Sequence, residues 1–502
     1  LLARELRLRL PSASVALFEK DLETDWKVGE STVEIASNFL VRRLRLSGYL
    51  YDQQLPKNGL RFFFDTPEKN ASLTSMSEIG SDHLPMFPTF QLDRKRFEAD
   101  LRRMNEADGV AMHVGWTVRD VALGEGGAPH TVRVRGDGEE KTITARWVVD
   151  ATGRASTLAR MLDLRTSADH PLSAVWARFA NVTDMDTLDE PEWRGRVRHT
   201  ARVLSTNHFC YPGYWIWFIP LGRGVTSLGV VGEKSVFRPG VRTAEGFTRF
   251  LREHRAPGSL LERAELLDVG GYTQLAYATK RFYSPERWAL IGDAAAFVDP
   301  FYSPGSDFIS IECDHVTELV ARDLAGESDF EERCRIYDEF MQFRFAATLL
   351  LYQGQYPCLG NFEILRLKWN YDIACYYNLW LDAFLRDGHL DPREVRSTLR
   401  RKTWILQALR SFRDLFARMA AETTRSGTYY RSNLGRYNDG TDLLYFAPEV
   451  GRPRKRREIN ARTGEIFGRV RREAAEVLGA RAADPGFREL LEEGTMASPD
   501  DE

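Results

Sequence analysis

The chain has 502 residues, of which 43% are hydrophobic and 28% are charged, as is usual for a soluble globular protein. Its 69 basic and 72 acidic residues give a formal charge of −3, which argues against a dedicated nucleic-acid binder. No apolar run reaches the roughly 20 residues that span a bilayer. The five cysteines include no C-x-x-C pair, which indicates reduced thiols in a cytoplasmic protein.

The first predicted elements match the pattern of the second half of a βαβ unit. Apolar spacing over residues 1–10 predicts a helix, and the apolar run 15–18 predicts a buried strand that ends in Glu19. An acid at the end of such a strand accepts hydrogen bonds from ribose hydroxyls in dinucleotide-binding folds. The alternative is a surface glutamate before a turn. We predict that Glu19 binds a cofactor.

Two later strand-and-turn segments support this prediction. Residues 147–150 run into Ala-Thr-Gly153, and residues 288–291 run into Gly292, Asp293 and three alanines. Small residues let the backbone pass close to a bulky ligand, and the helix N-terminus that follows can face a phosphate. Each segment alone is compatible with an ordinary strand-to-helix turn. Together with Glu19 they predict a Rossmann-like domain with Gly153, Gly292 and Asp293 at the cofactor.

The predicted secondary structure differs between three parts of the chain. Residues 91–108 predict a helix, and further strands are expected at 110–118, 130–136, 141–150, 174–179, 202–204, 214–220 and 225–231. Beyond residue 310 the spacing is helical. We therefore predict an α/β fold (α+β mixed) with a domain over 1–330. An antiparallel sheet is inserted in it at about 166–284, and a helical region covers 331–502.

Five segments resemble those of a known enzyme family. The stretches VVDATGR and LIGDAAAFVDP resemble the FAD-dependent enzymes built like aromatic hydroxylases. Within that group, residues 28–33, 57–62 and 215–220 resemble the flavin-dependent halogenases. The last of these, WIWFIP, matches W-x-W-x-I-P at every fixed position. The resemblance covers about residues 1–320.

The resemblance implies both a cofactor and a reaction. Reduced FAD, supplied by a separate flavin reductase, reacts with oxygen and a halide to give hypohalous acid. This oxidant then reaches a lysine beside an electron-rich aromatic substrate, phenolic or pyrrolic, free or tethered to a carrier protein. By resemblance Lys57 is that lysine, and Trp215 and Trp217 lie near the flavin and keep the substrate from it. Further flavin contacts are implied for Gly29, Glu30, Pro300 and Gly305.

The segment 299–305 bears on halide use. In the family, backbone N–H groups after D-P-x-x-S hold the halide, so Ser303 and Gly305 are the implied halide residues. Pro304 has no N–H, and one expected donor is therefore missing. Tyr302 stands where the tryptophan-halogenating members carry a catalytic acid, so free tryptophan is not the expected substrate. Two alternatives are a monooxygenase or dehydrogenase that does not use halide, and a non-catalytic protein derived from a flavoenzyme.

Structural interpretations remain open for several of these residues. Lys57 also fits a surface turn beside Pro56, the two tryptophans fit a packed core, and His208 fits a structural role. The nine histidines form no metal-binding spacing, so no metal is predicted. A G-x-G-x-x-G loop is expected about 20 residues before Glu19, which places it at or before Leu1, and no such pattern occurs in the sequence. We therefore expect the domain to lack its first strand and phosphate loop.

Overall fold

The computed structural model describes residues 1–440 and 444–492. Its Rossmann-like part contains two separate parallel strand pairs. Strand β1 (Ala16–Glu19) pairs with β6 (Ala111–Val114), and β10 (Val148–Asp150) pairs with β19 (Trp288–Leu290). Both β10 and β19 therefore lead into the turns that follow them at the same edge of the sheet.

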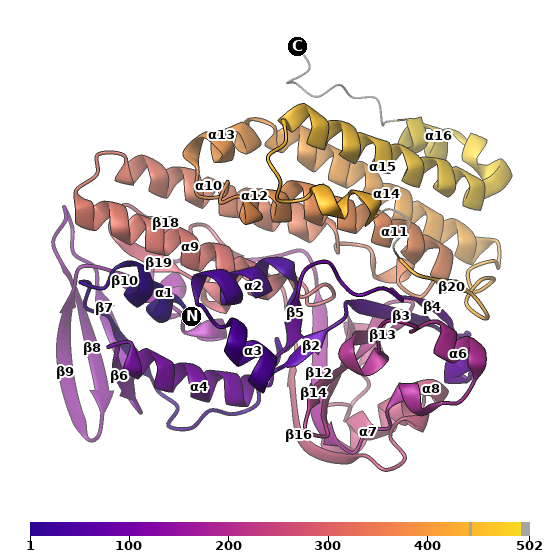
Figure 1. Ribbon diagram of the computed structural model, residues 1–502, viewed down its shortest axis with the longest axis horizontal. Helices are drawn as coiled ribbons and strands as arrows, with labels where there is room; N and C mark the ends of the chain where they lie inside the picture. Colours follow the sequence, from indigo (N-terminus) through magenta and orange to yellow (C-terminus); the bar gives the residue numbers. More distant parts are fainter. Residues whose placement is uncertain (441–443, 493–502) are drawn as a thin grey trace.

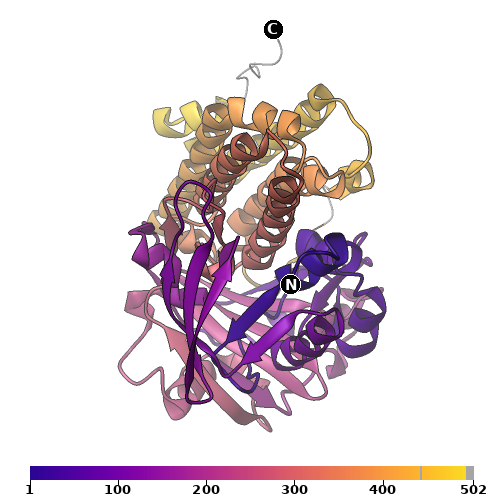
Figure 2. The same ribbon diagram turned by 90° about the vertical axis from the view of Figure 1, so that its left-hand side faces the viewer.

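Helices and a three-stranded ribbon surround these pairs. Helix α4 (Arg94–Ala107) begins after Asp93, whose side chain accepts from the backbone N–H of Arg96 and so caps the helix. The ribbon of antiparallel strands β7, β8 and β9 lies on the side that faces the viewer in Figure 2. The bounds of the other elements here are α1 (Leu2–Arg9), α2 (Glu34–Asn38), η1 (Phe39–Arg43), α3 (Ser47–Gln53), β7 (Thr117–Ala122), β8 (His130–Gly136), β9 (Glu139–Ala145), α5 (Thr157–Met161) and β18 (Tyr283–Ser284).

An eight-stranded sheet forms the second half of the lower layer, to the right in Figure 1. In spatial order its strands are β16 (Glu265–Tyr272), β12 (Leu172–Ala180), β15 (Val225–Glu233), β14 (Tyr214–Gly222), β13 (Thr206–Tyr211), β3 (Leu60–Phe64), β4 (Ser77–Ile79) and β20 (Tyr437–Asn438). The pairs β13–β3 and β4–β20 are parallel. The sheet thus takes strands from near residues 60–79 and 437–438 as well as from 166–284. Two short antiparallel pairs lie beside it: β2 (Leu55–Lys57) with β5 (Thr89–Gln91), and β11 (Arg165–Ser167) with β17 (Tyr277–Thr279).

The two faces of this sheet enter different cores, because successive side chains of a strand point to opposite faces. On β14, Trp215 and Trp217 belong to the large core beneath the helical layer. Ile216 and Phe218 belong to a smaller core on the other face. That face also packs against residues of α7 (Ala244–Arg252) and α8 (Arg255–Ser259). With both faces covered, nearly every residue of β12 to β15 is buried.

The strand predicted at 202–204 is wrong, and the strands predicted at 110–118 and 141–150 are each divided between two sheets, as β6 and β7 and as β9 and β10. Residues 202–204 form a 3₁₀ turn. The guanidinium of Arg202 binds Glu78 at 2.9 Å and Asp186 at 3.0 Å, and it stacks on the Trp193 ring. These contacts draw the segment out of the sheet, and a local apolar pattern does not reveal them.

Long helices form a layer over the sheets (Figure 1). They are α9 (Pro304–Ala325), α10 (Phe330–Leu350), α11 (Phe362–Cys375), the π-helical turn η9 (Tyr376–Leu381), α12 (Asp382–Leu385), α13 (Pro392–Arg400), α14 (Lys402–Arg425), α15 (Arg456–Leu478) and α16 (Pro485–Glu492). A helical C-terminal region is confirmed, with strand β20 as an exception within it. Its bounds of 331–502 stay a prediction, and residues 493–502 lie outside the described residues. Among the described helices, none has the length and apolar character of a membrane span.

Candidate active site

Two of the predicted cofactor turns lie side by side. The Ser156 hydroxyl, just after the turn at Gly153, donates to the backbone oxygen of Asp293 at 3.5 Å. The Asp150 carboxylate shapes its turn by accepting from the Thr152 N–H at 2.8 Å and from the next helix. The Glu312 carboxylate accepts from the Gly292 N–H at 2.5 Å. Both turns are therefore fixed by buried carboxylates.

Space and an unused acceptor are present at these turns. A Cβ atom on Gly153 or on Gly305 would meet no other atom within 4 Å. The carboxylate of Asp293 accepts no hydrogen bond from any described residue. Burial raises its pKa, and Arg154 opposes this effect. An open cradle beside an unpartnered carboxylate fits a flavin nucleotide, whose hydroxyl groups need an acceptor.

The other predicted cofactor residues lie apart from this pair of turns or are already engaged. Glu19 ends β1, which is not in the same sheet as β10 and β19, and its side chain accepts from the Asp21 N–H. Gly29 has a φ of 94°, a conformation that favours glycine. The buried Glu30 carboxylate accepts from the Arg178 guanidinium at 2.6 Å. The Glu30 carboxylate is thus engaged by a residue of β12 and does not face open space.

Lys57 is a buried amine, not a surface lysine. Its side chain is at the end of β2 and is 2% exposed. Its Nζ donates to the Ser31 hydroxyl at 2.8 Å and to the Thr32 backbone oxygen at 2.7 Å. Burial lowers the pKa of Lys57 to about 8, although Glu34 and Asp307 oppose the shift. Both the ammonium form and the amine form of Lys57 are therefore populated near neutral pH.

Four packed aromatic rings, which we call the aromatic wall, lie near this lysine. His208 packs against Phe62 and Trp215, each with ring centroids 5.0 Å apart, and against Phe301 at 5.3 Å. Burial lowers the pKa of His208 to about 3, and the charge of Lys57 acts in the same direction. The neutral ring donates from Nδ1 to the Arg61 backbone oxygen. His208 thus packs as a structural histidine in this wall.

The two predicted tryptophans lie on the same face, with ring centroids 5.7 Å apart. Trp217 lies over Gly229 on the neighbouring strand, where a Cβ would stand 2.2 Å from the indole. Its Nε1 donates to the Ser227 hydroxyl at 3.2 Å. Glycine is therefore required at position 229 for this ring position.

We expect Gly229→Ala to displace the Trp217 indole and to destabilise the fold by about 1–3 kcal/mol, the usual cost of overpacking a core. Thermal unfolding and tryptophan fluorescence measure the two effects. Gly195→Ala is the matched control, because a Cβ there meets no atom within 4 Å. Unchanged fluorescence and unfolding temperature in Gly229→Ala would contradict this packing.

A hydrogen-bond network joins Trp215 to the segment that begins at Asp299. The Trp215 Nε1 donates to the Tyr356 hydroxyl at 3.1 Å, which donates to the Asp299 carboxylate at 2.8 Å. His170 Nε2 donates to the same carboxylate at 2.7 Å. The other carboxylate oxygen accepts from the Phe301 N–H at 2.8 Å. Asp299 is therefore linked by hydrogen bonds both to the Trp215 side chain, through Tyr356, and to the backbone of the following loop.

That loop leads directly into helix α9. Ser303 has a φ of 56° and precedes Pro304, the first residue of the helix. The Gly305 N–H is in the first turn, where backbone donors have no partner within the helix. Pro300 precedes Phe301, whose ring packs against Trp215 at 5.1 Å. The predicted halide residues Ser303 and Gly305 are thus at a helix N-terminus, which favours anions.

Helix α9 also brings Asp307 beneath helix α2. The Asp307 carboxylate accepts from the Ala36 N–H at 3.0 Å and lies 3.9 Å from the Arg344 guanidinium. Burial raises the pKa of Asp307 to about 7, while Arg344 lowers it. The carboxylate is therefore engaged by α2 and Arg344 and is only partly charged at neutral pH.

Two tyrosines of the helical layer contact the same helix α2. The Tyr376 hydroxyl accepts from the Ile35 N–H at 3.1 Å, and the Tyr377 hydroxyl donates to the Glu34 carboxylate at 2.8 Å. Both lie in the π-helical turn η9, a type of distortion that is frequent at functional sites. Apolar spacing alone does not distinguish them from ordinary core tyrosines.

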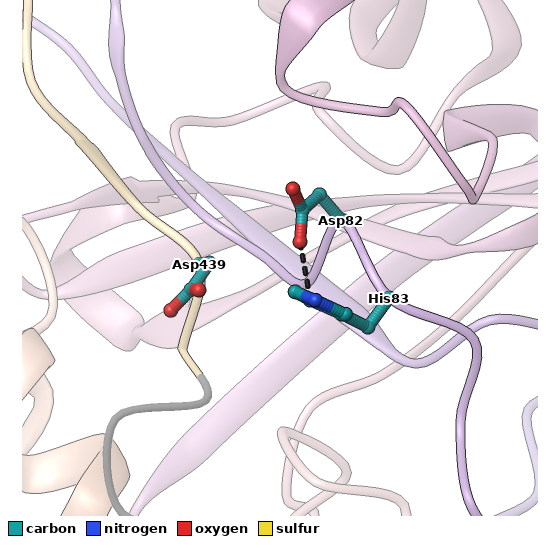
Figure 3. Close-up of side chains that lie close together, drawn as sticks. All are labelled: Asp82, His83 and Asp439. Carbon is teal, nitrogen blue, oxygen red and sulfur yellow. Dashed lines mark ion pairs between the residues drawn. The ribbon is translucent and has the colours of Figure 1, made fainter.

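A cluster of possible metal ligands lies elsewhere, at Asp82, His83 and Asp439 (Figure 3). One ligand atom from each residue falls within 4.8 Å of the others. His83 is 64% exposed and pairs with the Asp82 carboxylate. Exposed clusters of this kind are common without an ion, and we assign no metal to it.

Comparisons with known proteins agree on one family. The model of the tryptophan halogenase family matches residues 64–348. The flavin-dependent halogenase chlA of Dictyostelium discoideum is 29% identical over 422 residues, covering 78% of this chain and 69% of the relative. A 1H-pyrrole-2-carbonyl-(peptidyl-carrier protein) brominase of Pseudoalteromonas luteoviolacea is 24% identical, covering 72% of this chain and 84% of the relative. The structure of halogenase PltM in complex with phloroglucinol and FAD has a TM-score of 0.68 at 16% identity, covering 94% of each chain.

Proposed function

The chain belongs to the tryptophan halogenase family of flavin-dependent enzymes, and we propose that it halogenates an electron-rich phenol or pyrrole. It is an FAD-dependent oxidoreductase that uses oxygen and a halide. The observation that carries the proposal is the buried Lys57 amine beside the wall of His208, Trp215 and Phe301. PltM in complex with phloroglucinol and the brominase named for a carrier-bound pyrrole support a free phenol and a tethered pyrrole respectively.

FAD would be held by the two neighbouring turns and the start of α9. We assign this role to Gly153, Gly292, Asp293, Pro300 and Gly305. Asp293 would accept from a hydroxyl of the nucleotide, and the small residues would let the backbone approach it. Glu19, Gly29 and Glu30 stay predicted flavin contacts and are not assigned this role, because the Glu19 and Glu30 side chains already accept from the Asp21 N–H and from Arg178. When bound, reduced flavin would supply two electrons to oxygen, and oxygen at the peroxide level would then accept two electrons from the halide. A separate flavin reductase would reduce the flavin again.

Lys57 would present the oxidised halogen to the substrate. Its ammonium form can donate a hydrogen bond to hypohalous acid. Its amine form can take the halogen from hypohalous acid to become a haloamine, with the O–halogen bond broken and water released. The pKa of about 8 makes both forms available. Trp215 and Trp217 would form the barrier that keeps the organic substrate from the flavin. Ser31 and Thr32, which accept from the Lys57 Nζ, would orient the amine.

The halide would bind at the N-terminus of α9, through the N–H of Gly305 beside Ser303. Pro304 removes the donor between them. We therefore expect Pro304→Ala to tighten bromide binding about tenfold, as one charge-assisted hydrogen bond is worth about 1.5 kcal/mol. The dependence of initial rate on bromide concentration measures this. Pro392→Ala, at the first residue of α13, is the matched control. An unchanged KM for bromide in Pro304→Ala would contradict this halide position.

Free tryptophan is not the proposed substrate. Tyr302 replaces the expected catalytic acid, and burial raises the pKa of its hydroxyl well above the usual value. Its ring packs against Phe62, Phe301 and Trp369. A buried neutral phenol does not replace a carboxylate in orienting the indole of tryptophan.

A halide-dependence assay tests the function. Purified protein receives FAD, a flavin reductase with its nicotinamide, oxygen and a panel of phenols and carrier-bound pyrroles, with and without bromide. We expect products only when bromide is present, with a rate that saturates as bromide increases. Hydroxylated or desaturated products formed at the same rate without bromide would instead support a monooxygenase or dehydrogenase.

A further inference from the structure

A buried arginine of the helical layer has unused hydrogen-bond donors. Arg344 of α10 is 2% exposed. Its Nε and Nη1 atoms are enclosed and donate to no atom among the described residues. Burying a cation is costly unless hydrogen bonds replace those that it makes with water. The two unused donor atoms therefore indicate a partner that the described part of the chain does not supply.

Two nearby acids moderate the charge of Arg344 without using its donors. The Asp307 Oδ2 atom lies 3.9 Å from the Arg344 Nη2 atom, which is beyond hydrogen-bond distance. The other oxygen of Asp307 accepts from the Ala36 N–H. The Glu312 carboxylate, which also acts on the charge of Arg344, accepts from the Gly292 N–H. What Arg344 lacks is therefore a hydrogen-bond acceptor rather than an opposite charge.

The Arg344 guanidinium lies against the first turn of α9. It stacks on the Phe308 ring at 5.2 Å and on the Trp380 ring of η9 at 4.8 Å. Asp307 and Phe308 follow Pro304 by three and four positions, so all three share one face of the helix. Helical side chains point back toward the N-terminus of their helix. The guanidinium is therefore beside the end of α9 at which Pro304 has no N–H.

We propose that Arg344 donates a hydrogen bond to the halide and so replaces the donor that Pro304 lacks. This inference rests on the proposed function, which puts the halide at the Gly305 N–H. A Cβ atom on Gly305 would meet no other atom within 4 Å, so there is space for a monatomic ion beside that residue. A guanidinium and a helix N-terminus both favour an anion. The halide would thereby keep two N–H donors despite Pro304.

Arg344→Met in the full chain with FAD tests the proposal, because methionine keeps an apolar side chain beside Phe308 and Trp380 but has no donor. With a phenol that the wild type brominates, we expect KM for bromide to rise at least tenfold. The kcat at saturating bromide and KM for the phenol should each stay within twofold. Arg335→Met, which removes an exposed arginine of α10, is the control. An unchanged KM for bromide, or a rise only in KM for the phenol, would overturn the proposal.

Bromide soaked into crystals of the full chain with FAD locates the ion without turnover. We expect an anomalous scattering peak at the bromine edge between the Gly305 N–H and the Arg344 guanidinium, and no such peak in Arg344→Met. A wild-type peak away from Arg344, or none at α9, would overturn the proposal even if Arg344→Met fails to fold. Absence of any brominated product from the wild type would reject the proposed function. Brominated product together with bromide bound away from Arg344 would reject this inference alone.

Discussion

Lys57→Met is expected to lower the rate of halogenation at least 100-fold while leaving the protein folded and able to bind FAD. The loss follows from removing the only group proposed to hold the oxidised halogen, and groups in such roles contribute about 100- to 10,000-fold. Product yield by liquid chromatography and FAD binding by absorbance measure the two results. Lys402→Met, which removes a partly exposed lysine of α14 that pairs with Glu339, is the control. Full halogenation by Lys57→Met would contradict the assignment.

The same substitution should not reduce stability, because burying the Lys57 cation is costly. A fall in pKa from 10.5 to about 8 corresponds to about 3 kcal/mol against folding. The unfolded chain holds the proton more tightly, so this cost is complete below pH 8 and declines as the pH rises toward 10.5. The hydrogen bonds to Ser31 and Thr32 offset part of it. We therefore expect wild-type stability to improve relative to Lys57→Met above pH 8.

Asp299→Ala is expected to destabilise the protein by about 3 kcal/mol or more and to lower halogenation at least tenfold. It leaves the His170, Tyr356 and Phe301 donors without their buried acceptor, and each such loss costs about 1–3 kcal/mol. Chemical unfolding measures the stability. The activity falls because Trp215 and the loop that leads into α9 lose the carboxylate that holds both of them in position.

Tyr356→Phe separates positioning from stability in this network. It removes the acceptor of the Trp215 indole and one donor to Asp299, but keeps the ring. We expect a smaller stability loss, a shifted tryptophan fluorescence spectrum and a raised KM for bromide. Asp169→Ala, which removes an exposed carboxylate that accepts from the half-buried Gln353 amide, should change none of these. A stability loss in Asp299→Ala with an unchanged KM for bromide in the folded fraction would assign a purely structural role to the network.

The parts of the fold predicted from sequence are those encoded locally. Aromatic and β-branched residues predict strand β14, and the two-residue period of a strand predicts the shared face of Trp215 and Trp217. Strand-to-turn patterns predict the turns at Gly153 and Gly292, which the structure places side by side. Strand β20 was not predicted, because its pairing with β4 joins residues more than 350 positions apart. The local pattern predicts a strand at Arg202, where the structure has a turn, because that turn depends on distant carboxylates.

The contacts of the candidate site that join residues distant in the sequence could not be predicted either. The burial of Lys57 followed from its motif rather than from its Pro-Lys-Asn-Gly neighbours, which favour an exposed turn. Tyr356, Tyr376 and Tyr377 reach the site from the helical layer, and His170 reaches it from before β12. No local spacing links these residues to Asp299 or to α2.

The proposed reaction is the transfer of a halogen to an aromatic carbon. It is measured by mass spectrometry of the product formed from an electron-rich phenol with bromide, oxygen and enzymatically reduced FAD. We predict the paired isotope signature of bromine in the product of the wild-type chain and its absence with Lys57→Met. A product that carries added oxygen without bromine, formed equally by both proteins, would contradict the account.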